Sequence, residues 1–119
     1  MLRVLVVDDN FDTARNFYVS LRSAGHEAEF AVNGYGALEA AHRLRPDVVL
    51  LDIGLPDFDG CELARVLRRV PGMERVRILA VSGRGRAEDR HRALQAGCDD
   101  YLLKPADPAE VERLVALQR

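Results

Sequence analysis

Apolar runs in this chain end at residues that could carry chemistry, namely Asp8-Asp9, Asp52, Ser82 and Lys104. Carboxylates held close together repel, so one of them must either take up a proton or recruit a cation. Mg²⁺ suits such a set because it keeps several waters and needs only a few carboxylates. Mg²⁺ and an ammonium would neutralise a phosphoryl group, and Asp52 is the natural nucleophile for an acyl-phosphate intermediate. Brought together, these residues predict phosphoryl transfer.

The chain that must position them alternates short apolar runs with amphipathic stretches five times. The run 48–52 is apolar on both alternating faces and stops before Gly54 and Pro56, as a central parallel strand does. The run 27–32 alternates only weakly, which is typical of an edge strand. The predicted strands are 2–7, 27–32, 48–52, 76–81 and 100–103. The predicted helices are 11–21, 37–44, 60–70 and 88–96, followed by a last helix that Asp107 or Pro108 could start. The apolar stripe of the first helix begins at Phe11, and that of the last helix includes Val111, Leu114 and Val115 and could extend to Leu117.

This alternation predicts an α/β fold with a doubly wound, parallel five-stranded sheet. Right-handed crossovers and the edge-like second strand favour the flavodoxin-like (βα)5 order 2-1-3-4-5. The first and last helices would cover one face of the sheet, and the other three helices would cover the opposite face. The carboxyl ends of parallel strands meet at one edge, so the chemical residues would converge on one shallow pocket.

Length and composition limit the class of protein. With 119 residues, 48% of them apolar, the chain is expected to form one domain over 1–119. A net charge of −2 gives no electrostatic footprint for nucleic acid or a membrane surface. No apolar run approaches the roughly 20 residues of a membrane-spanning helix. Cys61 and Cys98 lack the spacing of a metal or redox motif, so we expect a cytoplasmic protein with reduced thiols.

Each candidate residue also has an ordinary structural explanation. Asp8-Asp9 could cap a helix, and Asp52 could be a turn residue. Ser82 and Lys104 could simply belong to surface loops. None of these residues is specific alone, but their joint placement after four different strands favours a functional site.

The ordered set of motifs resembles the receiver domain of two-component response regulators over essentially the whole chain. The resemblance implies the flavodoxin-like fold and a phosphorylatable signalling switch of a two-component or phosphorelay system, rather than an enzyme. The matching segments are VVDDN (6–10), DVVLLD (47–52), LP and DG (55–60), AVS (80–82), AG (96–97) and DDYLLKP (99–105).

The resemblance also implies a role for each acidic residue. Asp52 would accept a phosphoryl group from a phosphohistidine on a sensor histidine kinase or a histidine phosphotransfer protein. Asp9, Asp52 and the backbone carbonyl of Gly54 would bind Mg²⁺. Asp8 would act on the metal directly or through water.

Further roles follow from the same resemblance. Ser82 would hydrogen-bond a phosphoryl oxygen and Lys104 would pair with it, while the ring of Tyr101 would turn inward as Ser82 moves. The Lys104–Pro105 peptide bond is expected to be cis. A downstream protein would dock on the face formed by the fourth helix, the fifth strand and the fifth helix. The basic residues of that helix could equally be solvated charges.

Some positions depart from the common pattern or vary within the family. Ala106 follows Lys104-Pro105, where regulators with a winged-helix DNA-binding output typically have Phe. The segments 51–56 and 104–108 resemble more closely those of receivers attached to hybrid histidine kinases, or those of stand-alone receivers. Gly54 leaves the approach of water to Asp52 open, whereas Arg84 could screen the phosphate or remain solvated.

Two other classes of function compete with the switch. An aspartate-nucleophile phosphatase of the haloacid dehalogenase type also uses a carboxylate and Mg²⁺. Its nucleophile and a second Asp two residues on follow the first strand, a pattern that Asp8, Asn10 and Asp12 fit poorly. An interaction module that is never phosphorylated is the other alternative, which the intact set of acids, Ser82 and Lys104 disfavours.

Overall fold

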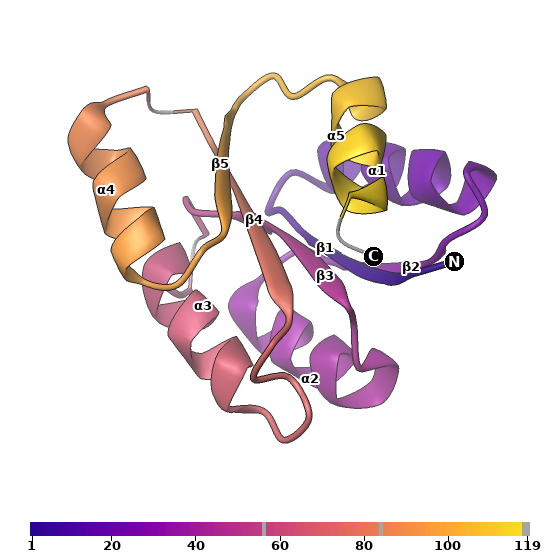
Figure 1. The fold of residues 1–119 in the computed structure, drawn as a ribbon, viewed down its shortest axis with the longest axis horizontal. Helices are drawn as coiled ribbons and strands as arrows, with labels where there is room; N and C mark the ends of the chain where they lie inside the picture. Colours follow the sequence, from indigo (N-terminus) through magenta and orange to yellow (C-terminus); the bar gives the residue numbers. More distant parts are fainter. Residues whose placement is uncertain (56, 84, 118–119) are drawn as a thin grey trace.

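A computed structural model describes residues 1–55, 57–83 and 85–117, and it contains five strands and five helices in strict alternation (Figure 1). The strands are β1 (Arg3–Val7), β2 (Glu27–Ala31), β3 (Val48–Asp52), β4 (Arg77–Ser82) and β5 (Asp100–Leu103). The helices are α1 (Phe11–Ser23), α2 (Gly34–Leu44), α3 (Gly60–Arg69), α4 (Ala87–Gln95) and α5 (Pro108–Ala116).

All strand pairs are parallel, and the sheet order is β2-β1-β3-β4-β5. The predicted flavodoxin-like order is therefore confirmed. The register places Val7 beside Leu51 and Asp52 beside Val81. The residues that follow β1 and β4 consequently lie on either side of the end of β3, the central strand.

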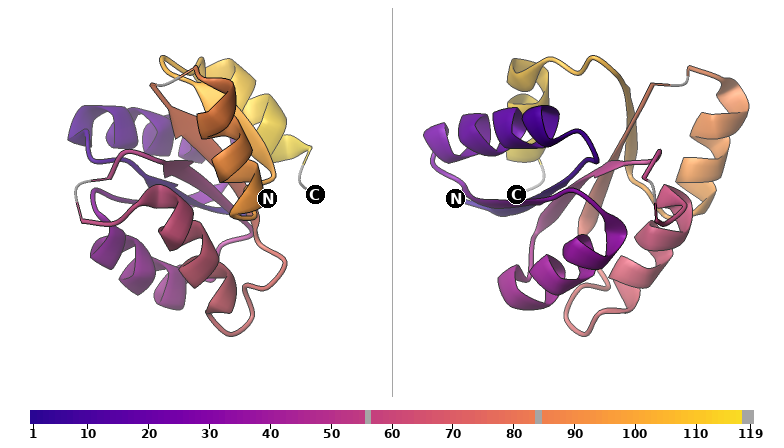
Figure 2. Two further views of the ribbon diagram at one scale, coloured as in Figure 1. Left: turned by 90° about the vertical axis from the view of Figure 1, so that its left-hand side faces the viewer. Right: turned by 180° about the vertical axis from the view of Figure 1, so that it is seen from behind.

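The helices form two layers around the sheet, with α1 and α5 on one face and α2, α3 and α4 on the other (Figures 1 and 2). Each face has its own cluster of buried side chains. Val48 and Leu50 of β3 belong to the α1–α5 side, whereas Val49 and Leu51 belong to the opposite side. Burial on both faces explains why this strand is continuously apolar.

Local side-chain caps start four of the helices. Asn10, Asn33, Asp59 and Asp107 each accept a backbone N–H from the first turn of the helix that follows. Such caps satisfy donors that have no partner inside the helix. Helix α4 differs because its N-cap residue, Arg86, makes no side-chain cap hydrogen bond.

Two residues of the predicted helix stripes are exposed instead of buried. Phe11 is 56% exposed, and its ring meets Phe30 edge-on with centroids 5.5 Å apart. It is the first residue of α1, and more than half of its surface is open to solvent. Leu117 is also exposed and lies beyond the end of α5. Helical spacing assigns a residue to a face, but only the neighbouring elements decide whether that position is covered.

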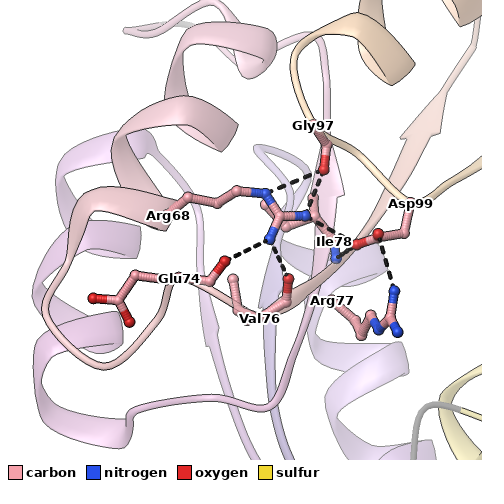
Figure 3. Close-up of polar contacts among 7 residues, drawn as sticks. All are labelled: Arg68, Glu74, Val76, Arg77, Ile78, Gly97 and Asp99. Atoms are coloured by element: carbon pink, nitrogen blue, oxygen red, sulfur yellow. Dashed lines mark hydrogen bonds and ion pairs between the residues drawn. The ribbon is translucent and has the colours of Figure 1, made fainter.

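At the amino-terminal edge of β4 and β5, Arg68 of α3 joins several segments (Figure 3). Its guanidinium donates to the carbonyl oxygens of Val76, at 2.7 Å, and Gly97. It also donates to the Asp99 carboxylate at 3.0 Å, which in turn accepts the Ile78 N–H at 2.9 Å. The Arg68 network therefore ties α3 to the start of β4 and to the turn between α4 and β5.

Candidate functional site

The carboxyl edge of the sheet brings Asp8, Asp52 and Lys104 into direct contact. Asp8 follows β1 and Asp52 ends β3, and the two residues are only 3% and 5% exposed. Lys104, the single lysine of the sequence, follows β5. Its Nζ lies 3.1 Å from Oδ2 of Asp8 and 3.1 Å from Oδ2 of Asp52. The Lys104 ammonium therefore forms ion pairs with two buried carboxylates.

The second oxygen of each buried carboxylate accepts a backbone N–H. Asp8 Oδ1 accepts from Asn10 at 2.9 Å, and Asp52 Oδ1 accepts from Gly54 at 3.0 Å. The orientation of both carboxylates is thus determined by the loops that follow β1 and β3. Gly54 contacts Asp52 through its N–H, while the predicted metal contact of its carbonyl remains a prediction.

The electrostatics of the site follow from burial and from these hydrogen bonds. Burial raises the pKa of Asp8, and the hydrogen bonds from Asn10 and Lys104 oppose that rise without cancelling it. Burial by itself would lower the pKa of Lys104, but its hydrogen bonds to Asp8 and Asp52 leave that pKa raised. The two carboxylates therefore favour the charged form of Lys104.

The donor set fits a hard divalent cation. Asp9 is exposed, yet carboxylate oxygens of Asp8, Asp9 and Asp52 lie within 4.8 Å of one another. Three carboxylates and one ammonium leave a formal charge of −2, which a divalent ion would balance. Because all the donors are oxygens and Asp9 faces solvent, the set suits Mg²⁺, which retains several of its waters.

Ser82 and Tyr101 flank this group on the last two strands. Ser82 is the buried last residue of β4, one position later than the predicted strand end, and its carbonyl accepts the Lys104 N–H at 2.8 Å. Tyr101 pairs with Ala80 in the sheet and packs, partly buried, against the core on the α2–α3–α4 side. The Lys104–Pro105 bond is cis, as expected.

A pocket of about 590 Å³ opens beside Asp52, between the loop after β3 and helix α4. Asp52 and Ser82 both line it, so the structure brings the predicted acid and hydroxyl to one cavity. Asp59 and Arg92 line its other end. Arg84, which could screen the phosphate or remain solvated, and Pro56, which is expected to follow the end of the strand, lie outside the described residues.

Two acids in the loop after β3 have partners that the sequence did not reveal. Asp57 accepts the backbone N–H groups of Gly34, at 2.8 Å, and Tyr35, at 3.2 Å, and the first of these bonds contributes most to lowering its pKa. Asp59, the N-cap of α3, also accepts a hydrogen bond from Arg92 of α4 at 2.9 Å. The spacing DFD at 57–59 is the only local signal of these contacts.

Comparison with known proteins identifies the family. A family model of the response regulator receiver domain matches residues 4–116 of this chain. The chain belongs to the response regulator receiver domain family. This assignment confirms the resemblance inferred from the motifs, and it leaves the dehalogenase-type alternative without support.

Individual relatives agree with the assignment of this receiver domain. The transcriptional regulatory protein PrrA of Mycobacterium tuberculosis is 42% identical over 118 residues, which cover 98% of this chain and 50% of PrrA. A 14.6 kDa protein of Leptolyngbya boryana is 38% identical over 112 residues, covering 94% of this chain and 86% of that protein. This receiver domain thus spans about half the length of the PrrA relatives that it matches.

Solved structures share the fold of the receiver domain. The chemotaxis protein CheY4 of Vibrio cholerae superposes with a TM-score of 0.93 at 27% identity, covering 100% of this chain and 99% of that one. A putative response regulator from Chloroflexus aurantiacus gives a TM-score of 0.89 at 32% identity, with coverage of 98% and 96%. Receiver domains generally bind Mg²⁺ at an acidic pocket, and Asp8, Asp9 and Asp52 form an acidic cluster here.

None of the described helices of this receiver domain combines the length and apolarity that crossing a bilayer requires.

Proposed function

We propose that this receiver domain is a phosphorylatable switch that accepts a phosphoryl group on Asp52. The donor would be a phosphohistidine on a sensor histidine kinase or a histidine phosphotransfer protein, in the cytoplasm. The observation that supports this most is the setting of Asp52. Its carboxylate is buried, oriented by the Gly54 N–H, and paired with Lys104 at 3.1 Å beside the oxygens of Asp8 and Asp9.

In the proposed step, a carboxylate oxygen of Asp52 forms a bond to phosphorus as the N–P bond of the phosphohistidine breaks. The released imidazole nitrogen keeps the electron pair of that bond. Mg²⁺, held by Asp8, Asp9, Asp52 and the carbonyl of Gly54, would supply charge neutralisation at the phosphoryl oxygens. Lys104 would move its ammonium from Asp52 toward the transferred group, because both need the same cation.

The proposed readout begins at Ser82, whose hydroxyl would donate to a phosphoryl oxygen. The phosphoryl group adds negative charge of about −1.5 to −2 beside β4. A shift of Ser82 and Tyr101 would then change the population of two arrangements of α4, β5 and α5. A downstream protein would bind this face, and no direct contact with nucleic acid is proposed for the domain.

The test uses acetyl phosphate with Mg²⁺, followed by intact mass. We expect an adduct of one phosphoryl group on the parent and none on Asp52→Asn, which preserves the shape of the side chain. An adduct on both proteins would contradict the assignment of Asp52. No adduct and no turnover on the parent would favour the interaction module, whereas sustained hydrolysis of several phosphate esters would indicate an enzyme.

A further inference from the structure

Helix α4 is fastened to the rest of the molecule mainly at its carboxyl end. All nine of its residues are described, and Ala93 is the one that is fully buried. The carbonyl of Ala93 accepts the Cys98 N–H at 3.1 Å, and the Gly97 carbonyl binds the guanidinium of Arg68 (Figure 3). At the other end Arg86 provides no side-chain cap. No residue of the amino-terminal half of α4 is fully buried, and its Asp89 lines the pocket beside Asp52, as Arg92 of the last turn does.

One ion pair links α4 to the element across the pocket. Nη2 of Arg92 lies 2.9 Å from Oδ2 of Asp59, while Oδ1 of Asp59 accepts the Cys61 N–H at 2.9 Å as the N-cap of α3. Among the ion pairs of residues 1–55, 57–83 and 85–117, it is the only one that joins α4 to another helix, here through the N-cap of α3, since Arg86–Glu88 lies within α4 and its own cap. The Asp59 carboxylate thus caps α3 and forms an ion pair with α4.

The ion pair stands at the wall of the pocket that contains the phosphoacceptor. Asp52 and Ser82 line this pocket on the sheet side, and Asp59 and Arg92 line it on the side of α3 and α4. The position of α4 consequently determines how wide the pocket is above Asp52. A contact that fixes α4 would control how freely small molecules reach that carboxylate.

We propose that the Asp59–Arg92 ion pair is a latch that holds α4 against the N-terminus of α3 and thereby slows the entry of small phosphodonors and water to Asp52. This inference rests on the proposed function, because it concerns the rates at which Asp52 gains and loses a phosphoryl group. Arg92 acts here as a positioning residue through α4 and needs no contact with the reacting atoms.

The Asp59–Arg92 ion pair is weak enough to open and close, as a latch must. The side chains of Arg92 and Asp59 are 56% and 40% exposed. Ion pairs of this kind contribute little stability and are screened by salt. The pair can therefore open without unfolding the domain, and the fraction of open molecules should increase with ionic strength.

The chain offers closely matched variants for a test. Asp59→Asn keeps an oxygen that can cap α3, because Asn is as good an N-cap as Asp, but it loses the ionic partner of Arg92. Arg92→Gln removes the other half of the pair. Arg90→Gln is the control, since Arg90 is exposed on the same helix and no ion pair of its side chain is found among the described residues.

Two rates are measured for each protein by intact mass: phosphorylation by acetyl phosphate with Mg²⁺, and hydrolysis after the donor is removed. The latch predicts that Asp59→Asn and Arg92→Gln each raise both rates about two- to fivefold, as expected for the loss of a weak exposed ion pair. The double variant should be no faster than either single one. The factor by which the rates of each variant exceed those of the parent should decrease as the salt concentration rises from about 0.05 M to 0.5 M.

Arg92→Gln is the decisive variant, because the loss of its positive charge and the release of α4 predict opposite changes in the rate of phosphorylation by an anionic donor. Removing a positive charge would slow phosphorylation, whereas releasing α4 would accelerate it. Slower phosphorylation in Arg92→Gln, or rates equal to those of the parent in both single variants, would overturn the latch. An equal acceleration in Arg90→Gln would do the same.

The two proposals fail in different ways. If the parent forms no adduct at all, the proposed function of Asp52 is wrong. If the parent forms the full adduct but the variants match its rates, only the latch is wrong. Thermal melting of each variant, expected to stay close to that of the parent, shows that rate differences do not arise from unfolding.

Discussion

At the scale of single residues, the site depends on the ammonium of Lys104, which lies 3.1 Å from a carboxylate oxygen of Asp8 and 3.1 Å from one of Asp52. Asp8, Asp9, Asp52, Ser82 and Lys104 could be predicted because each follows or ends an apolar run, and parallel strands end at one edge. The position of Lys104 between two carboxylates could not be predicted, because hydrogen-bond partners across the sheet leave no local pattern in the chain. The resemblance predicts a phosphoryl group as its partner, and the structure adds Asp8 and Asp52.

Replacing Lys104 with Met should lower stability and strengthen Mg²⁺ binding at the same time. Asp8 and Asp52 would lose their shared cation and remain buried together. Removing one partner of a buried pair costs about 3–5 kcal/mol. We expect about 2 kcal/mol here, because the Lys104 side chain is 30% exposed.

Urea unfolding with and without Mg²⁺ measures both effects, and Mg²⁺ should restore much of the stability lost in Lys104→Met. Arg113→Met removes a positive charge from an exposed position of α5 and should change the free energy of unfolding by less than about 0.5 kcal/mol. Weaker Mg²⁺ binding in Lys104→Met than in the parent would contradict the charge balance described for this site.

At the scale of helices and strands, hydrophobic spacing predicted every element, and the crossover rule with the edge-like second strand predicted both layers. Hydrophobic spacing failed for Phe11 and Leu117, which stand at the first position of α1 and just beyond the end of α5 and are mostly exposed. The contacts that join elements were also missed. Arg68, Asp57 and Asp59 are surface-type residues in sequence terms, and their partners are chosen by the assembled fold.

Replacing Arg68 with Lys should destabilise the domain although the charge is kept. The guanidinium donates hydrogen bonds to Val76, Gly97 and Asp99 at once, because its donors are spread over a rigid plane. An ammonium presents its three donors from a single nitrogen and cannot reach all three acceptors. Carbonyls left without a partner make the change cost about 2 kcal/mol.

Urea unfolding provides the comparison, with Arg69→Lys as the control on the adjacent, exposed position. The control should remain within about 0.5 kcal/mol of the parent. If both variants unfold at the same urea concentration as the parent, the Arg68 network does not contribute to holding α3 to the sheet.

At the scale of the whole molecule, folding gathers three carboxylates around one ammonium and leaves a formal charge of −2 at the edge of the sheet. Three carboxylates from β1 and β3 are gathered only when the sheet is complete, and the unfolded chain does not hold them together. Any ligand that binds the folded state alone stabilises it by mass action. Metal binding should therefore stabilise the folded state, and folding should create the metal site.

We expect Mg²⁺ to raise the melting temperature. At ten times its dissociation constant, the ion would add about 1.4 kcal/mol, which corresponds to a shift of about 4 °C or more for a domain of this size. Differential scanning fluorimetry with increasing Mg²⁺ measures the shift. Asp9→Asn, which removes the exposed carboxylate of the cluster, should reduce it, and an equal shift in that variant would place the ion elsewhere.

A practical consequence follows from the composition of the site. Its ammonium belongs to the only lysine in the chain, whereas every other basic side chain apart from histidine is an arginine. A sample labelled isotopically at lysine alone would give one side-chain ammonium resonance, and that resonance would need no assignment. Since the Lys104 Nζ contacts both Asp8 and Asp52, its chemical shift would report directly on metal binding, phosphorylation and hydrolysis in real time.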